Sequence, residues 1–291
     1  MAISNFRKAL SAAALVGFAT VPLASNAAVI SSLFQPGINT IQDSNAERVL
    51  RMVDGVETVI TSGAFQEGDV IQSVLRWTDV NAGQVSDSLP SPYQFTAYSE
   101  LRVAAINTFV VNGVSVDQLV FGATGNLGAN VLVSLYERSA PNATNSFSLT
   151  ADPLVGISQI LNQTLIGNFG FGDTDDFWQA TLLDTATQIS QVANAVQGSD
   201  QQSNGTFGLT MLSGSLNIAT NGILSGYDGN MHDVVGSSSI YVKDTGVNSG
   251  WLASSNTEAR FNVVPEPGSL VLMGLGLFGM GAIRRSKTES K

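Results

Sequence analysis

The sequence contains no cysteine and a single histidine among its 291 residues. The first absence excludes disulfides, thiolate metal sites and cysteine nucleophiles. The second excludes the usual zinc sites, because these combine several Cys and His ligands. A Ser-His-Asp hydrolase would have to use His232, yet the chain has no Gly-x-Ser-x-Gly turn. The surrounding "DGNMHDVVG" predicts that His232 is an exposed polar residue in a loop.

Charged residues are also scarce, at 12% of the chain. The few that occur are unevenly placed, since residues 28–264 hold 7 basic and 21 acidic side chains, a net charge of −14. Such a body is repelled by phosphate backbones and by anionic lipid, so nucleic acid is not an expected partner. Uncharged polar residues and glycine are frequent instead, namely Gly, Ser, Thr, Asn and Gln. This composition favours β structure with many turns and a surface made polar by hydroxyls and amides.

The first 27 residues have the three parts of a secretory signal peptide. Arg7 and Lys8 provide the positive start, an apolar stretch of about 13 residues follows, and small residues precede a cleavage point between Ala27 and Ala28. The alternatives are an uncleaved anchor or a buried helix, but the apolar stretch is short for a membrane span. The pattern therefore predicts signal peptidase and the secretion machinery as partners, and a mature chain that starts at Ala28.

The C-terminus carries a second apolar run, residues 270–283, made only of apolar residues and glycine. Its length of about 21 Å is short of the hydrocarbon core, but the uncharged residues before it bring it close to a span. Three basic residues follow directly, Arg284, Arg285 and Lys287. They favour a cytoplasmic location for the C-terminal end of this run. A buried core helix is the alternative. We expect a single transmembrane helix at about 269–283 with a basic tail at 284–291.

Pro265, Glu266 and Pro267, a small residue, the apolar run and the Arg284-Arg285 pair together resemble the PEP-CTERM sorting signal. This resemblance covers about 25 residues at the C-terminus and no part of the body. It implies a Gram-negative bacterium that makes extracellular polysaccharide, and an exosortase that cuts near Pro-Glu-Pro. The two prolines also keep this segment extended and open to a protease. The tail is then a temporary anchor in the inner membrane, and the released body is secreted or held at the cell surface.

The body, residues 28–263, shows mainly strand patterns. The clearest is 257–263, where Thr257, Ala259, Phe261 and Val263 alternate with polar residues. Further strands are expected around 71–80, 129–135, 206–211 and 237–244. No period of 20–50 residues repeats, which argues against a solenoid or propeller. The prediction is a single, mainly antiparallel β-sandwich-like domain with one or two helices, followed by the sorting signal at 264–291.

Two local patterns leave alternatives open. Asp54-Gly55 predicts a two-residue hairpin turn, while a short helix over residues 45–53 competes with it. Leu182, Ile189, Val192 and Val196 have helical spacing, and a weaker helix pattern lies in "DPLVGISQILNQ".

Asp173, Asp175 and Asp176 crowd three carboxylates into the loop "FGFGDTDDFW". Aspartates one or two residues apart can converge on Ca²⁺, so calcium is a possible cofactor here, although the spacing of an EF-hand is absent. The alternative is a solvated turn in which Asp175 or Asp176 caps the next element. A second acidic neighbourhood around Asp69 is more simply explained as a turn that enters a strand.

These patterns favour a non-enzymatic exported protein that acts in an exopolysaccharide matrix, in adhesion, biofilm or floc formation. A secreted polysaccharide hydrolase with two carboxylates is the first alternative, although no carboxylate pair can be chosen from the sequence. A calcium-dependent carbohydrate-binding module is the second. Trp251 is the aromatic residue best placed to be exposed for stacking on a sugar, against a role in the core.

Overall fold

The structure is a computed structural model that describes residues 33–81, 83–84, 94–138, 147, 152–183, 203–216, 218–220, 224–241 and 250–264. The chain divides into two compact units, residues 28–265 on the one hand and the two ends, 1–27 and 266–291, on the other. All of the described residues belong to the first unit.

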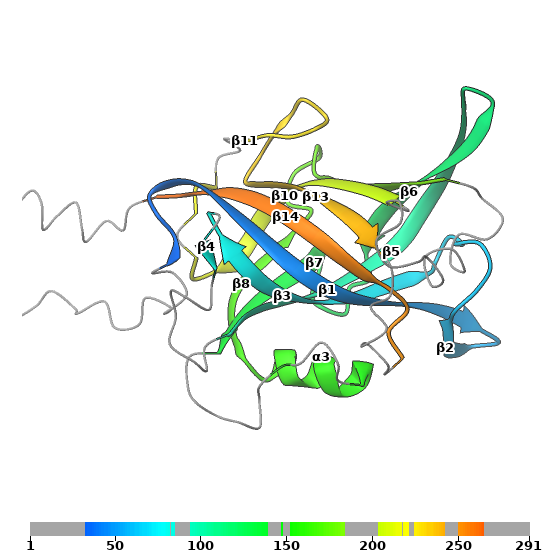
Figure 1. The fold of residues 1–291 in the computed structure, drawn as a ribbon, viewed down its shortest axis with the longest axis horizontal. Helices are drawn as coiled ribbons and strands as arrows, with labels where there is room; N and C mark the ends of the chain where they lie inside the picture. Colours follow the sequence, from blue (N-terminus) through cyan, green and yellow to red (C-terminus); the bar gives the residue numbers. More distant parts are fainter. Residues whose placement is uncertain are drawn as a thin grey trace, which may run out of the picture. The chain divides into compact units, whose positions relative to one another are not determined.

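This unit is built almost wholly from antiparallel strands (Figure 1). The strands are β1 (Gly37–Val53), β2 (Val56–Ile60), β3 (Val70–Val80), β4 (Gly83–Gln84), β5 (Gln94–Val111), β6 (Val114–Ala123), β7 (Val131–Arg138), β8 (Thr164–Gly170), β9 (Phe177–Leu183), β10 (Ser203–Gly214), β11 (Leu224–Ser225), β12 (Met231–His232), β13 (Val234–Tyr241) and β14 (Ser254–Val263). The helix described is α3 (Pro153–Leu161). The predicted mainly antiparallel β class is therefore confirmed.

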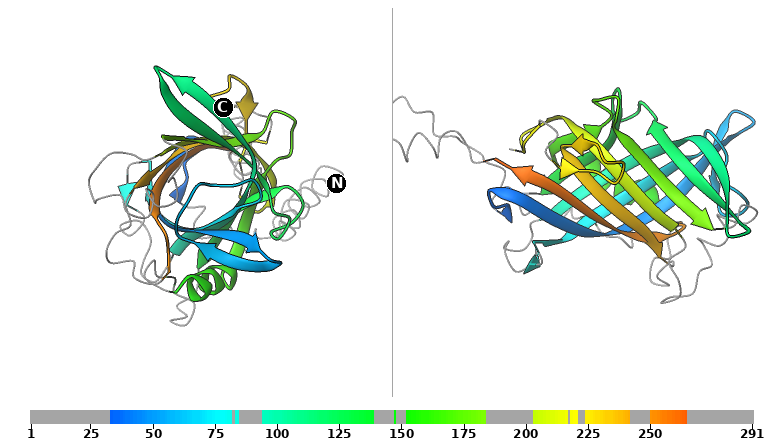
Figure 2. Two further views of the ribbon diagram at one scale, coloured as in Figure 1. Left: turned by 90° about the vertical axis from the view of Figure 1, so that its right-hand side faces the viewer. Right: turned by 90° about the horizontal axis from the view of Figure 1, so that it is seen from above.

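The main sheet closes on itself. Its pairings run β3–β1–β14–β13–β10–β8–β7–β5, and β5 pairs again with β3. Seen end-on, these strands surround a common interior (Figure 2). The two layers expected of a sandwich are thus joined at both sides into one continuous wall. Closure leaves these eight strands with a hydrogen-bonded neighbour on either side, which removes the exposed edges of an open sheet.

Two further strands complete one end of this wall. β10 pairs with β9 through residues 203–208 and with β8 through residues 210–214. In the same way, β5 pairs first with β7 and then, from Leu101 onward, with β6. Because β6 also pairs with β9, the gap between β5 and β10 is filled by β8 and β7 at one end and by β9 and β6 at the other.

The side chains that alternate inward along these strands form the main core. In β14 the buried positions are Ser255, Thr257, Ala259 and Phe261, while Asn256 and Arg260 are exposed. This is the alternation predicted for residues 257–263, and the prediction is confirmed. Burial of these apolar faces is the main favourable term in folding.

A smaller apolar cluster lies under α3 on the outside of the wall. Ile157 and Ile160 of the helix pack with Val74, Tyr98 and other buried residues of the strands below. The side chain of Asp152 caps the helix by accepting a hydrogen bond from the Leu154 amide, and Pro153 occupies the first turn, where its missing N–H costs nothing. The weaker helix pattern of the sequence is confirmed.

The other helix prediction is wrong where the structure describes it. Leu182, its first residue, belongs to strand β9 and is buried in the main core. Pairing of β9 with both β6 and β10 outweighs the local helical spacing. The remaining positions, Ile189 to Val196, lie outside the described residues.

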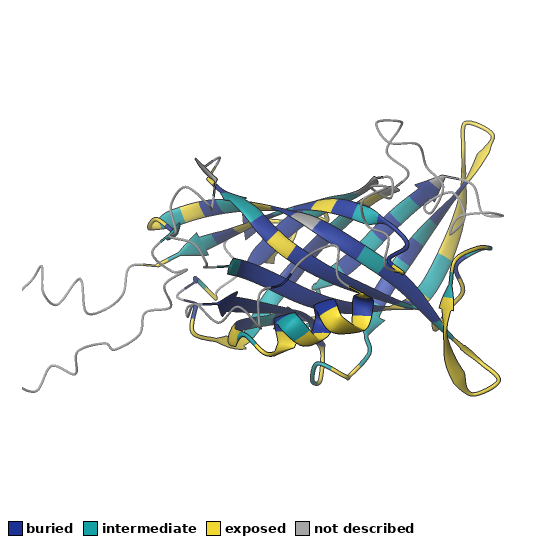
Figure 3. Ribbon diagram, turned by 60° about the horizontal axis from the view of Figure 1, so that its bottom comes forward, coloured by how far each residue is buried: buried dark blue, intermediate teal, exposed yellow. Residues whose placement is uncertain are grey.

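Two long hairpins carry exposed apolar side chains (Figure 3). Residues 45–53 form part of strand β1, so the hairpin prediction at Asp54-Gly55 is confirmed and the competing helix is absent. Both turn residues have positive φ, of 52° and 79°, as this tight turn requires. Asn112 and Gly113 make the equivalent turn between β5 and β6, beside Phe109 and Val110, which are 47% and 74% exposed.

Candidate binding site

β1 and β14 are joined in two different ways along their length. From Gly37 to Gln42, β1 forms a regular antiparallel ladder with β14. A bulge then shifts the register of β1 against β3. Farther along, β1 is joined at Glu47 to Ala253, the residue before β14, by an isolated bridge. Between these points polar side chains connect the strands. We call this stretch the seam, and its residues are Asp43, Asn45 and Glu47 of β1 with Ser255 and Thr257 of β14.

The seam is a chain of short hydrogen bonds. The Thr257 amide donates to Asp43 Oδ1 at 2.6 Å, which replaces a backbone partner that the ladder no longer supplies. The Asn45 amide lies 3.0 Å from the hydroxyl oxygens of both Ser255 and Thr257. Ser255 in turn lies 2.6 Å from Glu47 Oε1. The seam thereby satisfies polar groups that would otherwise be buried without partners.

The amide of Asn45 fits the seam in two orientations, and each requires a proton on a different carboxyl group. With its NH₂ toward the two hydroxyls, its oxygen faces Asp43, which must then donate a proton. With its NH₂ toward Asp43, its oxygen accepts from both hydroxyls, and Glu47 must donate to Ser255. In both arrangements the seam holds one proton, shared between Asp43 and Glu47.

The surroundings of both acids favour this proton. Burial raises the pKa of Asp43 well above its ordinary value, against the opposing effect of the Thr257 N–H, and the nearby Glu47 raises it further. Burial likewise raises the pKa of Glu47, against hydrogen bonds from Ser255 and Ser73. Within the described residues, the ion pairs involve neither acid. A carboxyl that is buried without a cation is more stable in its neutral form.

The outer side of the seam opens into a polar groove that crosses β3, β1, β14 and β13. All of its lining residues carry a hydroxyl, amide or carboxyl group, and they are Gln42, Asp43, Thr78, Asp79, Ser237, Ser239, Asn256, Thr257 and Glu258. Four of these groups are paired with one another, since Gln42 donates to Glu258 at 3.1 Å and Thr78 donates to Asp79 at 2.7 Å. The exposed Gln42 and Asn256 amides remain accessible on the groove surface. Such a lining matches a ligand rich in hydroxyl groups.

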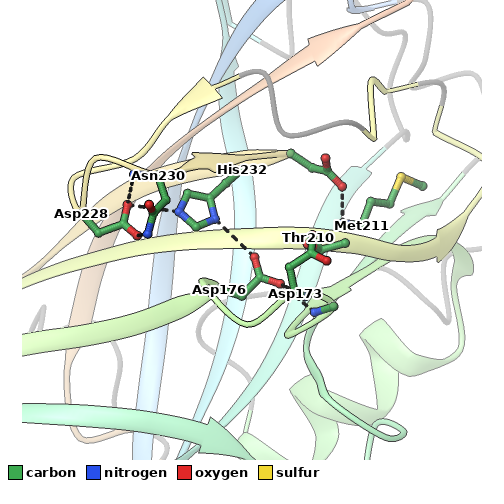
Figure 4. A network of polar contacts seen from close by, with 9 residues as sticks. Asp173, Asp176, Thr210, Met211, Asp228, Asn230 and His232 are labelled. Carbon is green, nitrogen blue, oxygen red and sulfur yellow. Dashed lines mark hydrogen bonds and ion pairs between the residues drawn. The ribbon is translucent and has the colours of Figure 1, made fainter.

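Two of the three aspartates predicted to bind calcium, Asp173 and Asp176, contact different partners (Figure 4). Asp176 Oδ2 accepts from the backbone amides of Gly172 and Asp173, at 2.7 and 2.8 Å. The Asp173 carboxylate instead accepts from the Thr210 hydroxyl at 3.3 Å. Among the residues that the structure describes, no group of three or more His, Cys, Asp or Glu side chains is placed to hold a metal ion. This geometry favours the alternative from the sequence, a turn organised by Asp176.

His232 is buried at 2% exposure, so the prediction of an exposed loop residue is wrong. It belongs to β12, and its ring lies against Gly208 of β10, where a Cβ atom would overlap the ring. Nδ1 faces Asp176 at 3.3 Å and Nε2 faces Asp228 at 3.1 Å (Figure 4). These two carboxylates compensate the burial of the ring, and they explain why a polar residue is found there.

The environment of His232 also bears on the hydrolase alternative. Both ring nitrogens face carboxylate oxygens, at 3.3 and 3.1 Å, so both are already engaged. A general base needs a free ring nitrogen within reach of the nucleophile, and His232 has none in this arrangement. Asp228 stands only four residues before His232, a spacing that could have indicated one of these contacts from the sequence. Asp176 is 56 residues away and could not be found in this way.

Other residues considered from the sequence have structural roles. Asp69 is buried and pairs with Arg51 through two contacts of 2.6 Å, and it also accepts from the Gln66 amide, so it organises the turn that enters β3. Trp251 is 1% exposed and packs in the cluster under α3. The core alternative is therefore confirmed for Trp251, and it is not available for stacking on a sugar.

The predicted address signals fall outside the described residues. This holds for the cleavage point at Ala27 and Ala28, and for the sorting residues Pro265, Glu266, Pro267, Arg284 and Arg285. The predicted transmembrane helix at about 269–283 lies there too. Among the helices that the structure does describe, none is long and apolar enough to cross a membrane.

Comparison with known protein families gives a match at the C-terminus. A family model described as the PEP-CTERM protein-sorting motif matches residues 263–286. No curated protein and no solved structure matches the chain. The motif implies export, membrane-associated sorting and processing by an exosortase, while residues 28–262 are assigned to no family.

Proposed function

We propose that the protein is exported, released by exosortase and acts without catalysis in an extracellular polysaccharide matrix, in adhesion, biofilm or floc formation. The signal peptide would bring the body across the inner membrane, and the C-terminal helix would anchor it there until cleavage. The sorting motif supports the route. The observation that supports the role of the body is the polar groove over the seam.

The chemistry of the groove suits a saccharide. Sugar hydroxyls both donate and accept hydrogen bonds, and the groove offers them amide donors at Gln42 and Asn256 and carboxylate acceptors at Asp79 and Glu258. It spans four neighbouring strands, so it can contact an extended chain over several sugar units. Its lining includes no aromatic side chain, which indicates binding through hydrogen bonds rather than through stacking.

Two features argue against the hydrolase alternative. The two acids of the seam, Asp43 and Glu47, are buried and partly buried, respectively, and they share hydrogen bonds with Asn45 and Ser255. A glycosidase instead places two carboxyl groups on opposite sides of an accessible glycosidic bond. His232 is likewise enclosed between its two aspartates.

Binding can be tested with the processed protein and the producer's own exopolysaccharide. We expect the protein to be retained on the polysaccharide, with no change in its chain length. Gln42→Ala combined with Asn256→Ala should weaken retention, because both amides are exposed in the groove. Asn107→Ala on the exposed part of β5 is the matched control and should bind like the parent. Shortened polysaccharide would support the hydrolase, and equal retention of all variants would exclude the groove.

The sorting route has a separate test. Changing Pro265, Glu266 and Pro267 together to alanine should extend the helix toward the body and remove the accessible segment. The altered protein should then accumulate in the membrane fraction at full length minus its signal peptide. The parent should appear outside the cell, shorter by roughly 25 residues at the C-terminus. Mass spectrometry decides this, since extracellular parent that retains Lys291 would reject processing at the motif.

A further inference from the structure

The polar groove over the seam has a size and a charge that narrow the kind of saccharide it can bind. It encloses about 360 Å³, which lies within the range of sites that bind small molecules. Its lining includes the acidic residues Asp43, Asp79 and Glu258. Among the described residues that line it, there is no lysine, arginine or histidine.

Two of these acids flank one amide across three neighbouring strands. Gln42 of β1 stands directly opposite Asp79 of β3 on one side and opposite Glu258 of β14 on the other. Ser237 of β13 stands opposite Glu258 and continues the same row. Because neighbouring strands lie about 4.8 Å apart, the backbones of Asp79 and Glu258 are separated by about 10 Å. The two carboxylates are therefore placed to contact two points of an extended ligand rather than one ion.

These two carboxylates give the groove more capacity to accept hydrogen bonds than to donate them. A carboxylate only accepts, and it has about four lone-pair sites. Asp79 uses one oxygen for the Thr78 hydroxyl, and Glu258 uses one for the Gln42 amide. In the part of the chain that the structure describes, neither acid forms an ion pair. The remaining acceptor sites suit a ligand group that donates several hydrogen bonds, as an ammonium group does.

The charge around the groove has the same sign as the groove itself. Arg76 of β3 and Arg260 of β14 are exposed, and both lie outside the groove lining. The net charge of −14 over residues 28–264 attracts cationic ligands and repels anionic ones. A polysaccharide of uronic acids or sulfate esters would therefore meet like charge. An ammonium group would instead form charge-assisted hydrogen bonds, which are about twice as strong as neutral ones.

We infer that the groove is specific for a saccharide with free amino groups, a glucosamine-type polymer, over neutral and acidic polysaccharides. This specificity rests on the proposed function, which places an extended saccharide in the groove. One ammonium group lies against Asp79 and another against Glu258, while sugar hydroxyls contact the Gln42 and Asn256 amides. An N-acetylated saccharide of the same backbone carries no charge at these points and loses both ion pairs.

The test compares two soluble probes of equal length, the hexamer of glucosamine and the hexamer of N-acetylglucosamine. Each is titrated into the processed protein in a calorimeter at mildly acidic pH, where the amines are protonated. The glucosamine hexamer should bind at least about tenfold more tightly, because its amines add hydrogen bonds between charged groups. This difference should shrink as salt is added.

A pair of charge-removing variants separates the groove from the general charge of the body. Asp79→Asn combined with Glu258→Gln keeps the size of both side chains and should abolish the difference between the hexamers. Glu57→Gln combined with Glu67→Gln is the matched control, because it changes the net charge equally at exposed acids outside the groove, and it should keep the difference. Unfolding midpoints show whether the variants fold like the parent, and each single groove change serves if the combined variant does not.

The inference is overturned if the two hexamers bind the parent equally well, or if both combined variants lose binding to the same extent. It is also overturned if oligolysine of the same length binds as tightly as the glucosamine hexamer, since charge alone would then explain binding. Failure of the proposed function gives a different result, the absence of retention on the producer's own polysaccharide. Retention there without a difference between the hexamers overturns the amino specificity alone.

Discussion

The two halves of the β1–β14 contact differ in what holds them together. From Gly37 to Gln42 the backbone forms the ladder, and the side chains are free to alternate between core and solvent. From Asp43 to Glu47 side chains make the connection themselves, and all of them except the partly buried Glu47 are buried. Backbone hydrogen bonds do not depend on which side chains are present, so the ladder half is compatible with many sequences. The seam instead depends on the identity and protonation of a few residues.

The largest effect is expected from the core side of the ladder half. Phe261 is 2% exposed and meets the edge of Phe34 at a centroid distance of 5.0 Å. Phe261→Asp would bury a carboxylate among apolar side chains, and we expect a loss of more than about 4 kcal/mol and no stable fold. Circular dichroism with denaturant unfolding measures this. A folded variant of near-parent stability would show that this strand is not part of the core.

A smaller but clear effect is expected in the seam. Asn45→Ala removes the amide between Asp43 and the two hydroxyls and leaves these buried groups without partners. The free energy of unfolding should fall by about 1–3 kcal/mol. Asn107→Ala, at an exposed position of β5, is the control and should change it by less than about 0.5 kcal/mol. Equal losses in the two variants would mean that the seam contributes no more than an ordinary strand surface.

The seam should also make stability depend on pH. The pKa values of Asp43 and Glu47 are raised in the folded state, so above the ordinary carboxyl range the folded chain binds more protons than the unfolded chain. Their contribution is therefore fully present below that range and is lost as the pH rises through the folded pKa values. Asp43→Asn should reduce the loss of unfolding free energy with rising pH. Glu67→Gln on the exposed turn is the control and should leave that loss unchanged. Parallel unfolding profiles for the parent and Asp43→Asn would contradict the shared proton.

The smallest effect is expected on the outer side of the ladder half. Glu258 is partly exposed and accepts one hydrogen bond, from Gln42. Glu258→Lys should cost under about 1 kcal/mol, because the backbone ladder remains and water replaces the lost contact. Comparison with Phe261→Asp in the same unfolding assay gives the difference between the two faces of β14. Similar losses from both changes would mean that the two faces of the strand are not distinct.

Much of the fold could be predicted from local patterns. The alternation around Phe261, the Asp54-Gly55 turn and the helix at Pro153 each depend on neighbours a few residues apart, and all three are present. The strand at Leu182 was missed because its two partner strands decide its structure, not its own spacing. The seam shows the same limit, since Asp43, Asn45 and Glu47 alternate as in a strand but their role depends on β14.

The sequence by itself determined the C-terminal sorting motif, the antiparallel β class and the tight turns, because each depends on composition or on residues close together in the chain. Only the tertiary structure decided how the sheet closes, which side chains meet in the seam and why His232 is buried. These features join residues as far apart as Asn45 and Ser255, which are separated by 210 positions. Side chains at such distances become neighbours only through the pairing of strands, and that pairing sets the burial and hydrogen bonding on which their chemistry depends.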